Sequence, residues 1–266
     1  MNPNKEVLKL IEQQRRILKQ YSDMLKPTIQ ALELLNIPKI EVPEVEIPKI
    51  NIPKIDFPTF PKIEFPEIII DYENIEKLAN NNSLRGWTLS GEIDTSFYLN
   101  EELLDRDQDY IDEYFLNYFE SDSQKNLLIM KNSITNSIDD KWKSVVEDCF
   151  LLYKTDKYKI TIPMLITIIE GEISKIAESN KVGYYLLKDW EEIINPEDKL
   201  MFIVTYTLHQ FLAGEIFASK NFNDERGTNI NRNWVLHGRD NPSLWTRTDV
   251  LKLMNIISTL QFVQDK

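Results

Sequence analysis

The sequence predicts an all-α protein, and three observations lead to that fold class. Apolar residues at three- and four-residue spacing dominate from residue 71 onward, and alternating strand patterns are almost absent. Glycine is scarce, with 7 in 266 residues, which argues against a turn-rich β fold. Apolar residues make up 42% of the chain, enough for a sizeable core. We predict an amphipathic helix over 1–35, an extended arm over 36–70 and a helical bundle over 71–266.

The first helix is expected to begin at Asn2-Pro3, because asparagine caps helices and proline fits their first turn. From Val7 to Leu35, mostly apolar positions alternate at spacings of four and three, as in a coiled-coil seam. An amphipathic helix docked on its own domain would show the same pattern, and Pro27 should kink it. Residues 1–20 are charged and lack an apolar run, so we expect no signal peptide.

The arm is an internal repeat in which seven prolines lie between Pro38 and Pro66, mostly five residues apart. Each proline restricts the residue before it to extended geometry, which excludes a helix. A stiff spacer is one interpretation. The abundance of Ile, Val and Phe favours a second one, a strip that docks on a partner or on its own domain, because disordered linkers rarely carry so many apolar residues.

Helical periodicity and capping signals then define the bundle. Apolar residues share one face from Asp139 to Tyr153, and Thr161-Ile162-Pro163 opens the next helix. Asn195-Pro196 predicts the start of a helix that continues to Ala218. Thr246-x-x-Asp249 is a capping box that opens an amphipathic last helix.

Metal sites find no support in the sequence. Residues 105–109 resemble half of a calcium loop, but Tyr110 and Leu116 replace the required Gly and Glu. We expect an acidic helix there, with Tyr110, Ile111, Tyr114 and Phe115 toward the core. Two distant histidines and one cysteine make a poor zinc site, and His209, between apolar neighbours, is expected to be structural. We predict no metal and no cofactor.

The net charge of −12 excludes a broad basic surface for nucleic acid. The acidity belongs to residues 71–219, which carry −14, whereas residues 220–266 carry +2. A single cysteine, Cys149, cannot form an internal disulfide and favours a cytoplasmic location. No apolar run approaches 18 residues, so no membrane span is expected.

One motif carries chemistry: Arg232-Asn233, followed by His237-Gly238. This Arg-x4-His pattern, with Asn after the Arg, resembles the HEPN family (higher eukaryotes and prokaryotes nucleotide-binding domain). The stretch 158–165 and the following Ile169-Glu170-Gly171 look like the helix found upstream of the motif in some bacterial HEPN proteins. The resemblance covers residues 140–262.

The resemblance implies an all-α, homodimeric, metal-independent endoribonuclease, with the two motifs facing across a cleft. Arg232 would hold the scissile phosphate, His237 would transfer a proton, and Asn233 would orient His237 or the substrate. Arg226, Arg239 and Glu170 are further candidates for substrate binding. A toxin–antitoxin or phage-defence setting is also implied, with an antitoxin or another partner bound through residues 1–70.

The chemistry of the residues agrees with a nuclease. RNA can be cleaved by its own 2′-hydroxyl if one group moves a proton and a cation stabilises the phosphate. Histidine titrates near neutral pH, and arginine grips phosphate oxygens in a fork. On a regular helix Arg232 and His237 would point about 140° apart. Either the helix ends at Gly238 or two chains pair their motifs.

Alternatives stay open for each of these residues. Arg232 could be a structural ion-pair partner, and His237 could be a helix C-terminal residue before a glycine cap. Glu170 is either a buried partner of the arginine or a partly exposed acid. The whole protein could be a non-catalytic dimeric binding module that recruits a partner through residues 1–70, or, less in keeping with the motif, a structural coiled-coil protein.

Overall fold

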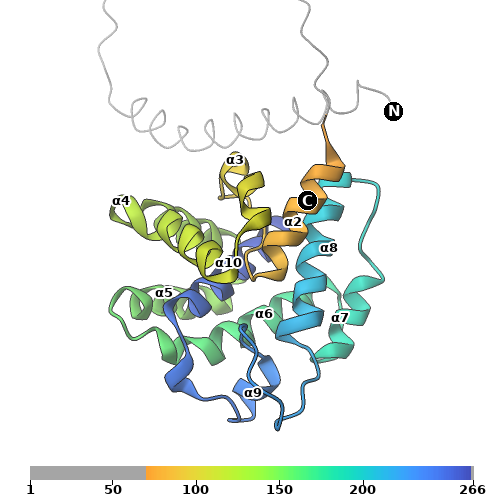
Figure 1. Cartoon of the computed structure of the whole chain (residues 1–266). Helices are drawn as coiled ribbons and strands as arrows, with labels where there is room; N and C mark the ends of the chain where they lie inside the picture. The colour runs from red at the N-terminus through yellow and green to blue at the C-terminus, as the bar shows by residue number, and fades with distance from the viewer. Residues whose placement is uncertain (1–69, 265–266) are drawn as a thin grey trace, which may run out of the picture. The chain divides into compact units, whose positions relative to one another are not determined.

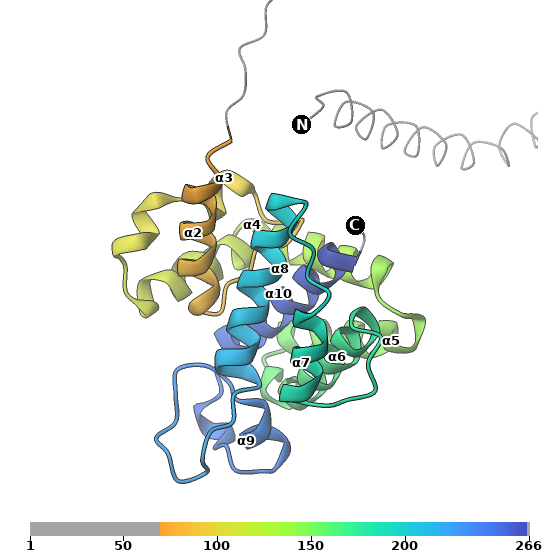
Figure 2. The same ribbon diagram turned by 90° about the vertical axis from the view of Figure 1, so that its right-hand side faces the viewer.

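The computed structural model describes residues 70–264, and every regular element in that part of the chain is helical. Figure 1 and Figure 2 show these elements from two sides. The α-helices are α2 (Tyr72–Leu84), α3 (Thr95–Tyr98), α4 (Gln108–Ser137), α5 (Asp140–Lys154), α6 (Ile162–Ile176), α7 (Tyr184–Glu191), α8 (Lys199–Phe211), α9 (Arg232–Leu236) and α10 (Arg247–Gln264). Shorter turns are η1 (Glu101–Asp105), η2 (Tyr158–Thr161) and η4 (Pro242–Leu244), which are 3-10, and η3 (Leu212–Ile216), which is a π-helical turn. The all-α prediction is confirmed for these residues.

Two predicted segments lie outside the described residues: the helix over 1–35 and, except for Ile70, the proline arm over 36–70. Within residues 70–264, no helix combines the length and the apolar character that crossing a membrane requires.

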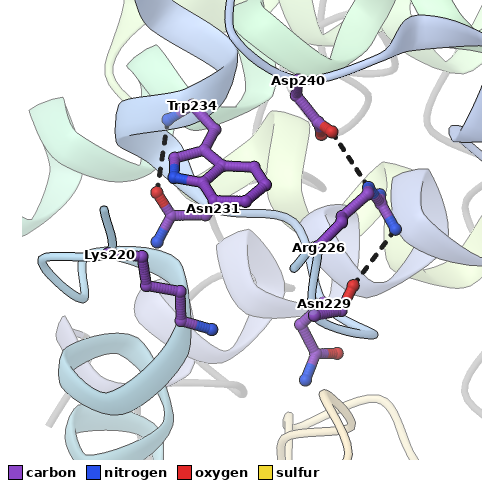
Figure 3. Close-up of a pocket in the computed structure, with 7 residues that line it drawn as sticks. Lys220, Arg226, Asn229, Asn231, Trp234 and Asp240 are labelled. Atoms are coloured by element: carbon purple, nitrogen blue, oxygen red, sulfur yellow. Dashed lines mark hydrogen bonds and ion pairs between the residues drawn. The ribbon is translucent and has the colours of Figure 1, made fainter. Parts of the chain in front are cut away.

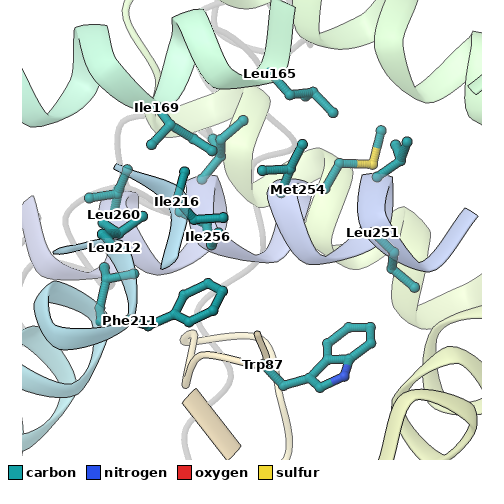
Figure 4. Packing of buried hydrophobic residues seen from close by; sticks show 14 of the residues in the cluster. Trp87, Leu165, Ile169, Phe211, Leu212, Ile216, Leu251, Met254, Ile256 and Leu260 are labelled. Carbon is teal, nitrogen blue, oxygen red and sulfur yellow. The ribbon is translucent and has the colours of Figure 1, made fainter. Parts of the chain in front are cut away.

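Helix α10 runs through the middle of the bundle and is buried on all sides. Residues 249–261 are all buried, and α6, α4 and α8 pack against the helix (Figure 4). Its polar residues find partners inside the core. Lys252 Nζ donates to Asp112 Oδ2 at 3.0 Å, and the backbone N–H of Thr88 donates to Asn255 Oδ1 at 2.8 Å. The sequence predicts an amphipathic helix here, whereas a helix buried on every side is what a central position requires.

Three predicted features of the bundle are confirmed. Helices α5 and α6 occupy the expected residues and bury the expected faces. The capping box before α10 is formed, because the N–H of Thr246 donates to Asp249 Oδ2 at 2.8 Å and the N–H of Asp249 donates to Thr246 Oγ1 at 3.1 Å. The carboxyl of Asp249 in this capping box is buried, which raises its pKa, and the hydrogen bonds that it accepts from Thr246 oppose that shift.

The predicted acidic helix over residues 105–109 is present only in part, because α4 begins at Gln108 and Asp107 is its N-cap. Asp107 caps α4 by accepting the N–H of Tyr110 at 2.9 Å. Ile111 and Phe115 are fully buried, and Phe115 stacks on Trp87 with ring centroids 4.7 Å apart. Tyr110 is 40% exposed, so its predicted position in the core is wrong. Its ring lies instead under the guanidinium of Arg106.

Helix α4 is broken at its middle, at Ser121-Asp122-Ser123, which are residue types that favour turns. Asp122, Ser123 and Gln124 all have positive φ, between 47° and 62°, although none of them is glycine. The side chain of Asn126 donates to the carbonyl oxygen of Tyr118 at 2.8 Å and bridges the break. Neither Gly nor Pro, the residues that most often interrupt a helix, occurs between Gln108 and Ser137.

Helix α8 begins later than predicted. The N-cap of α8 is Asp198, whose Oδ1 accepts the N–H of Met201 at 3.2 Å. Asn195 instead stabilises a turn before the helix, because its Oδ1 accepts the N–H of Glu197 at 2.9 Å. The helix gives way to the π turn η3 after Phe211, before the predicted end at Ala218. His209 is buried and bonds through Nε2 to the Leu187 carbonyl at 3.0 Å, in the structural position that the sequence predicts.

Candidate functional site

The Arg-x4-His motif forms α9, a helix of five residues at one end of the bundle (Figure 2). Asn231 starts it, since its Oδ1 accepts the N–H groups of Asn233 and Trp234 at 3.1 and 3.2 Å. The Nδ2 of Asn231 donates to the carbonyls of Glu215 and Ala218 at 3.0 and 2.9 Å. This buried side chain therefore fixes α9 to the end of the π turn.

Sequence reasoning missed the role of Asn231. An asparagine directly before a helix is a recognised N-cap signal, so the capping half of the role was accessible from the sequence. The bonds back to Glu215 in η3 and to Ala218 just after it were not, because they join residues 16 and 13 positions apart in the chain.

Arg232 forms a two-point ion pair with Glu170 of α6. Its Nη2 lies 2.9 Å from Oε2 and 3.1 Å from Oε1, and its Nε lies 3.2 Å from Oε2. The side chains are only 18% and 15% exposed. Oε1 also accepts the N–H of Gly183 at 2.7 Å. Of the two alternatives that the sequence leaves open for Glu170, the structure shows the partner of the arginine. Through its bonds to Arg232 and Gly183, this carboxylate joins α6 to α9 and to the start of α7.

Asn233 supports the arginine. Its Oδ1 accepts Nη1 of Arg232 at 3.1 Å, so every nitrogen of the guanidinium has an acceptor. The HEPN resemblance assigns Asn233 to orienting His237 or the substrate. Among the described residues its side chain instead bonds to Arg232.

His237 lies at the opposite end of α9, where it is the C-cap. Its backbone N–H donates to the carbonyl of Asn233 at 3.1 Å. Gly238 follows with φ +64°, the left-handed conformation that favours glycine after a helix. The imidazole is exposed, and its described contact is the ring of Phe222, with centroids 6.0 Å apart. No hydrogen bond in the described part of the chain joins the His237 ring to Arg232 or Asn233.

The other two candidate arginines differ from each other. Arg226 holds the loop before α9, since its Nε lies 2.9 Å from Asp240 Oδ1 and its Nη1 donates to the Gly227 carbonyl at 3.2 Å. Figure 3 shows Arg226 directed at Asp240, and both side chains line a small cavity together with Trp234. This pairing gives Arg226 a structural task, whereas the sequence suggests a substrate-binding residue. Arg239 is exposed and lies 5.4 Å from the centroid of Phe222.

The arrangement therefore brings Arg232, Asn233 and Glu170 together and leaves His237 on the surface at the other end of α9. A held guanidinium can stabilise a negative phosphate, and an exposed imidazole can exchange a proton with a bound group. Residues 70–264 contain no group of three His, Cys, Asp or Glu side chains placed to hold a metal ion.

Comparisons with protein-family models, with curated proteins and with solved structures found no match to this chain.

Proposed function

We propose that this chain is a metal-independent endoribonuclease of the HEPN type, acting as a homodimer. The observation that carries the proposal is the short helix α9, which holds a fixed guanidinium at its first residue and presents an exposed imidazole directly after its last. The HEPN resemblance of the Arg232 to His237 motif supplies the reaction class.

Arg232 would bind the scissile phosphate. A guanidinium has five N–H groups, and the four bonds to Glu170 and Asn233 leave one hydrogen, on Nη1, for a phosphate oxygen. Because Glu170 fixes the plane of the fork, little side-chain entropy remains to be lost when the phosphate binds. The same carboxylate lowers the local positive potential, so binding depends on close contact more than on long-range attraction.

His237 would transfer the proton. In the reaction the 2′-oxygen of RNA attacks phosphorus, the O2′–P bond forms and the P–O5′ bond breaks. The proton of the 2′-hydroxyl passes to a base, and an acid protonates the departing 5′-oxygen. The products are a 2′,3′-cyclic phosphate, or the 3′-phosphate after hydrolysis, and a 5′-hydroxyl. An exposed imidazole is suited to either proton transfer.

A homodimer is part of the proposal because a single chain does not bring its own Arg232 and His237 into contact. Two copies related by a twofold axis can place the arginine of one motif beside the histidine of the other. With a chain charge of −12, RNA affinity should be modest and should fall steeply with salt. Cytoplasmic toxin–antitoxin or phage-defence action, with a partner bound by residues 1–70, belongs to the same proposal.

One observation favours a second candidate function, a non-catalytic dimeric module that recruits a partner. Every nitrogen of Arg232 is bonded within the chain, which is also what a purely structural arginine would show. In that case the motif would build the end of the bundle, and RNA would not be a substrate.

Cleavage of RNA in EDTA separates the two functions. The wild-type protein should degrade RNA without added metal, and His237→Ala should abolish this while keeping the same melting temperature and oligomeric state. Because the variant is purified identically, it also controls for contaminating nucleases. Equal RNA loss with both proteins, or no loss with either, would refute the nuclease and favour the binding module.

A further inference from the structure

Phe222 is a large aromatic side chain displayed beside the proposed proton-transfer residue. It is 47% exposed, in the loop between the π turn η3 and α9. The His237 ring meets it edge to face, with an interplanar angle of 71°. The guanidinium of Arg239 lies over the ring at 5.4 Å from its centroid. A single exposed phenylalanine is ordinary on a protein surface, but this one contacts both a histidine and an arginine.

The loop is built to hold this ring outward. Asn221 and Asp224 close a turn around it: the Asn221 N–H donates to Asp224 Oδ2 at 2.9 Å, and the Asp224 N–H donates to the Asn221 carbonyl at 3.0 Å. The N–H of Asn223 also donates to Asn221 Oδ1 at 3.0 Å. These local bonds fix the turn on both sides of Phe222, so the ring is exposed on an ordered segment.

Arg239 keeps its charge available at this position. Arg226 and Arg232 are each paired with a carboxylate, whereas Arg239 has no ion pair with the residues from 70 to 264. Asp224 and Glu225 are the acids of the same loop, and the carboxylate of Asp224 is occupied by the Asn221 N–H. Phe222 and Arg239 therefore offer an aromatic face with an adjacent cation.

We propose that Phe222 and Arg239 hold one unpaired nucleobase next to the phosphodiester on which His237 acts, which makes Phe222 a substrate-positioning residue. The inference rests on the proposed ribonuclease function. Bases stack on aromatic rings and on guanidinium planes, and every base has a face for this contact. A base inside a duplex is already stacked on its neighbours, so the site selects a base that is free of pairing.

The test measures binding without cleavage. A fluorescent single-stranded RNA with 2′-O-methyl sugars lacks the attacking hydroxyl, and its affinity is read by anisotropy at fixed salt. We expect Phe222→Ala to weaken binding about tenfold, within the range for loss of one base stack, and Phe222→Tyr to bind within about twofold of wild type. Tyr110→Ala is the matched control, because Tyr110 is an exposed ring under the guanidinium of Arg106, in the first turn of α4. It should bind as wild type does.

A set of RNAs with one abasic nucleotide each sharpens the result. At one position the missing base should weaken binding to wild type about tenfold and leave binding to Phe222→Ala unchanged, since the two changes remove the same contact. Equal affinity of wild type and Phe222→Ala would overturn the inference. So would a changed oligomeric state of Phe222→Ala, which would make Phe222 a contact between chains.

The outcomes distinguish this inference from the function on which it rests. Cleavage by wild type without any effect of Phe222→Ala on binding would remove the inference and leave the nuclease. Binding that depends on Phe222, with unmodified RNA left intact in EDTA, would remove the nuclease and leave the base contact. A wild-type protein that binds no single-stranded RNA overturns both.

Discussion

Glu170 and Arg232 lie 62 residues apart in the chain and form a two-point ion pair, with Nη2 2.9 Å from Oε2 and 3.1 Å from Oε1. The carboxylate also accepts the N–H of Gly183, so the pair joins three helical elements as well as orienting the arginine. Structure and proposed chemistry thus depend on one contact, and variants at these two positions separate them.

Glu170→Ala should lower the free energy of unfolding by about 2 kcal/mol, somewhat below the cost of breaking a fully buried pair. The exchanged variant, Glu170→Arg with Arg232→Glu, should recover part of this loss because the pair re-forms, although the Gly183 bond does not. RNA cleavage should be absent in the exchanged variant, because the cation has moved from α9 to α6. Chemical denaturation and the EDTA assay measure the two effects.

A different result would change the role of the pair. If Glu170→Ala unfolds at the wild-type denaturant concentration, the ion pair contributes nothing to the fold. If the exchanged variant cleaves RNA as fast as wild type, the position of the arginine on α9 is not what the reaction needs.

We predict that the substitution Asn231→Asp destabilises the protein, although aspartate is an excellent helix N-cap. The substitution keeps the oxygen that accepts the N–H groups of Asn233 and Trp234. It replaces the donor that binds the Glu215 and Ala218 carbonyls with a second oxygen. We expect Asn231→Asp to cost roughly 2 kcal/mol, at least as much as Asn231→Ala, because two carbonyls lose their partner and face a carboxylate instead.

Thermal unfolding followed by circular dichroism measures this cost. A neutral Asn231→Asp variant would show that capping alone accounts for the residue and that the bonds to η3 contribute no stability.

Cys149 should resist thiol reagents in the folded protein. Its side chain is buried, and burial raises the pKa of the thiol to about 11, with a smaller contribution from Asp148. At neutral pH almost none of it is the reactive thiolate. A colorimetric disulfide reagent should therefore label the native protein slowly near neutral pH and label one site at once in denaturant. Rapid stoichiometric labelling of the native protein would contradict the buried position.

The sequence predicts best what depends on local patterns. Helices α5 and α6 and the capping box at Thr246 follow from periodicity and short-range hydrogen bonding, and all are present. The break in α4 escapes prediction because three consecutive non-glycine residues from Asp122 adopt positive φ. The burial of α10 on every side also escapes it, since the polar residues on that helix find partners that are distant in sequence.

The candidate site shows the same division. Adjacent residues indicate that α9 ends before Gly238, which has the left-handed φ that glycine favours after a helix. The partner of Arg232 stays open in the sequence, because 62 residues separate it from Glu170 and no periodic pattern spans that distance. An acid in an otherwise apolar helix is the one signal, and it does not specify which cation the acid meets.

The most direct test of the composite site mixes two inactive variants. Arg232→Ala and His237→Ala should each fail to cleave RNA in EDTA. After their chains are exchanged at equal amounts, cleavage should return to about one quarter of the wild-type rate, because half of the randomly mixed dimers are heterodimers and each has one of its two sites intact. A mixture as inactive as its components, or a wild-type protein that leaves RNA uncut, would contradict the account.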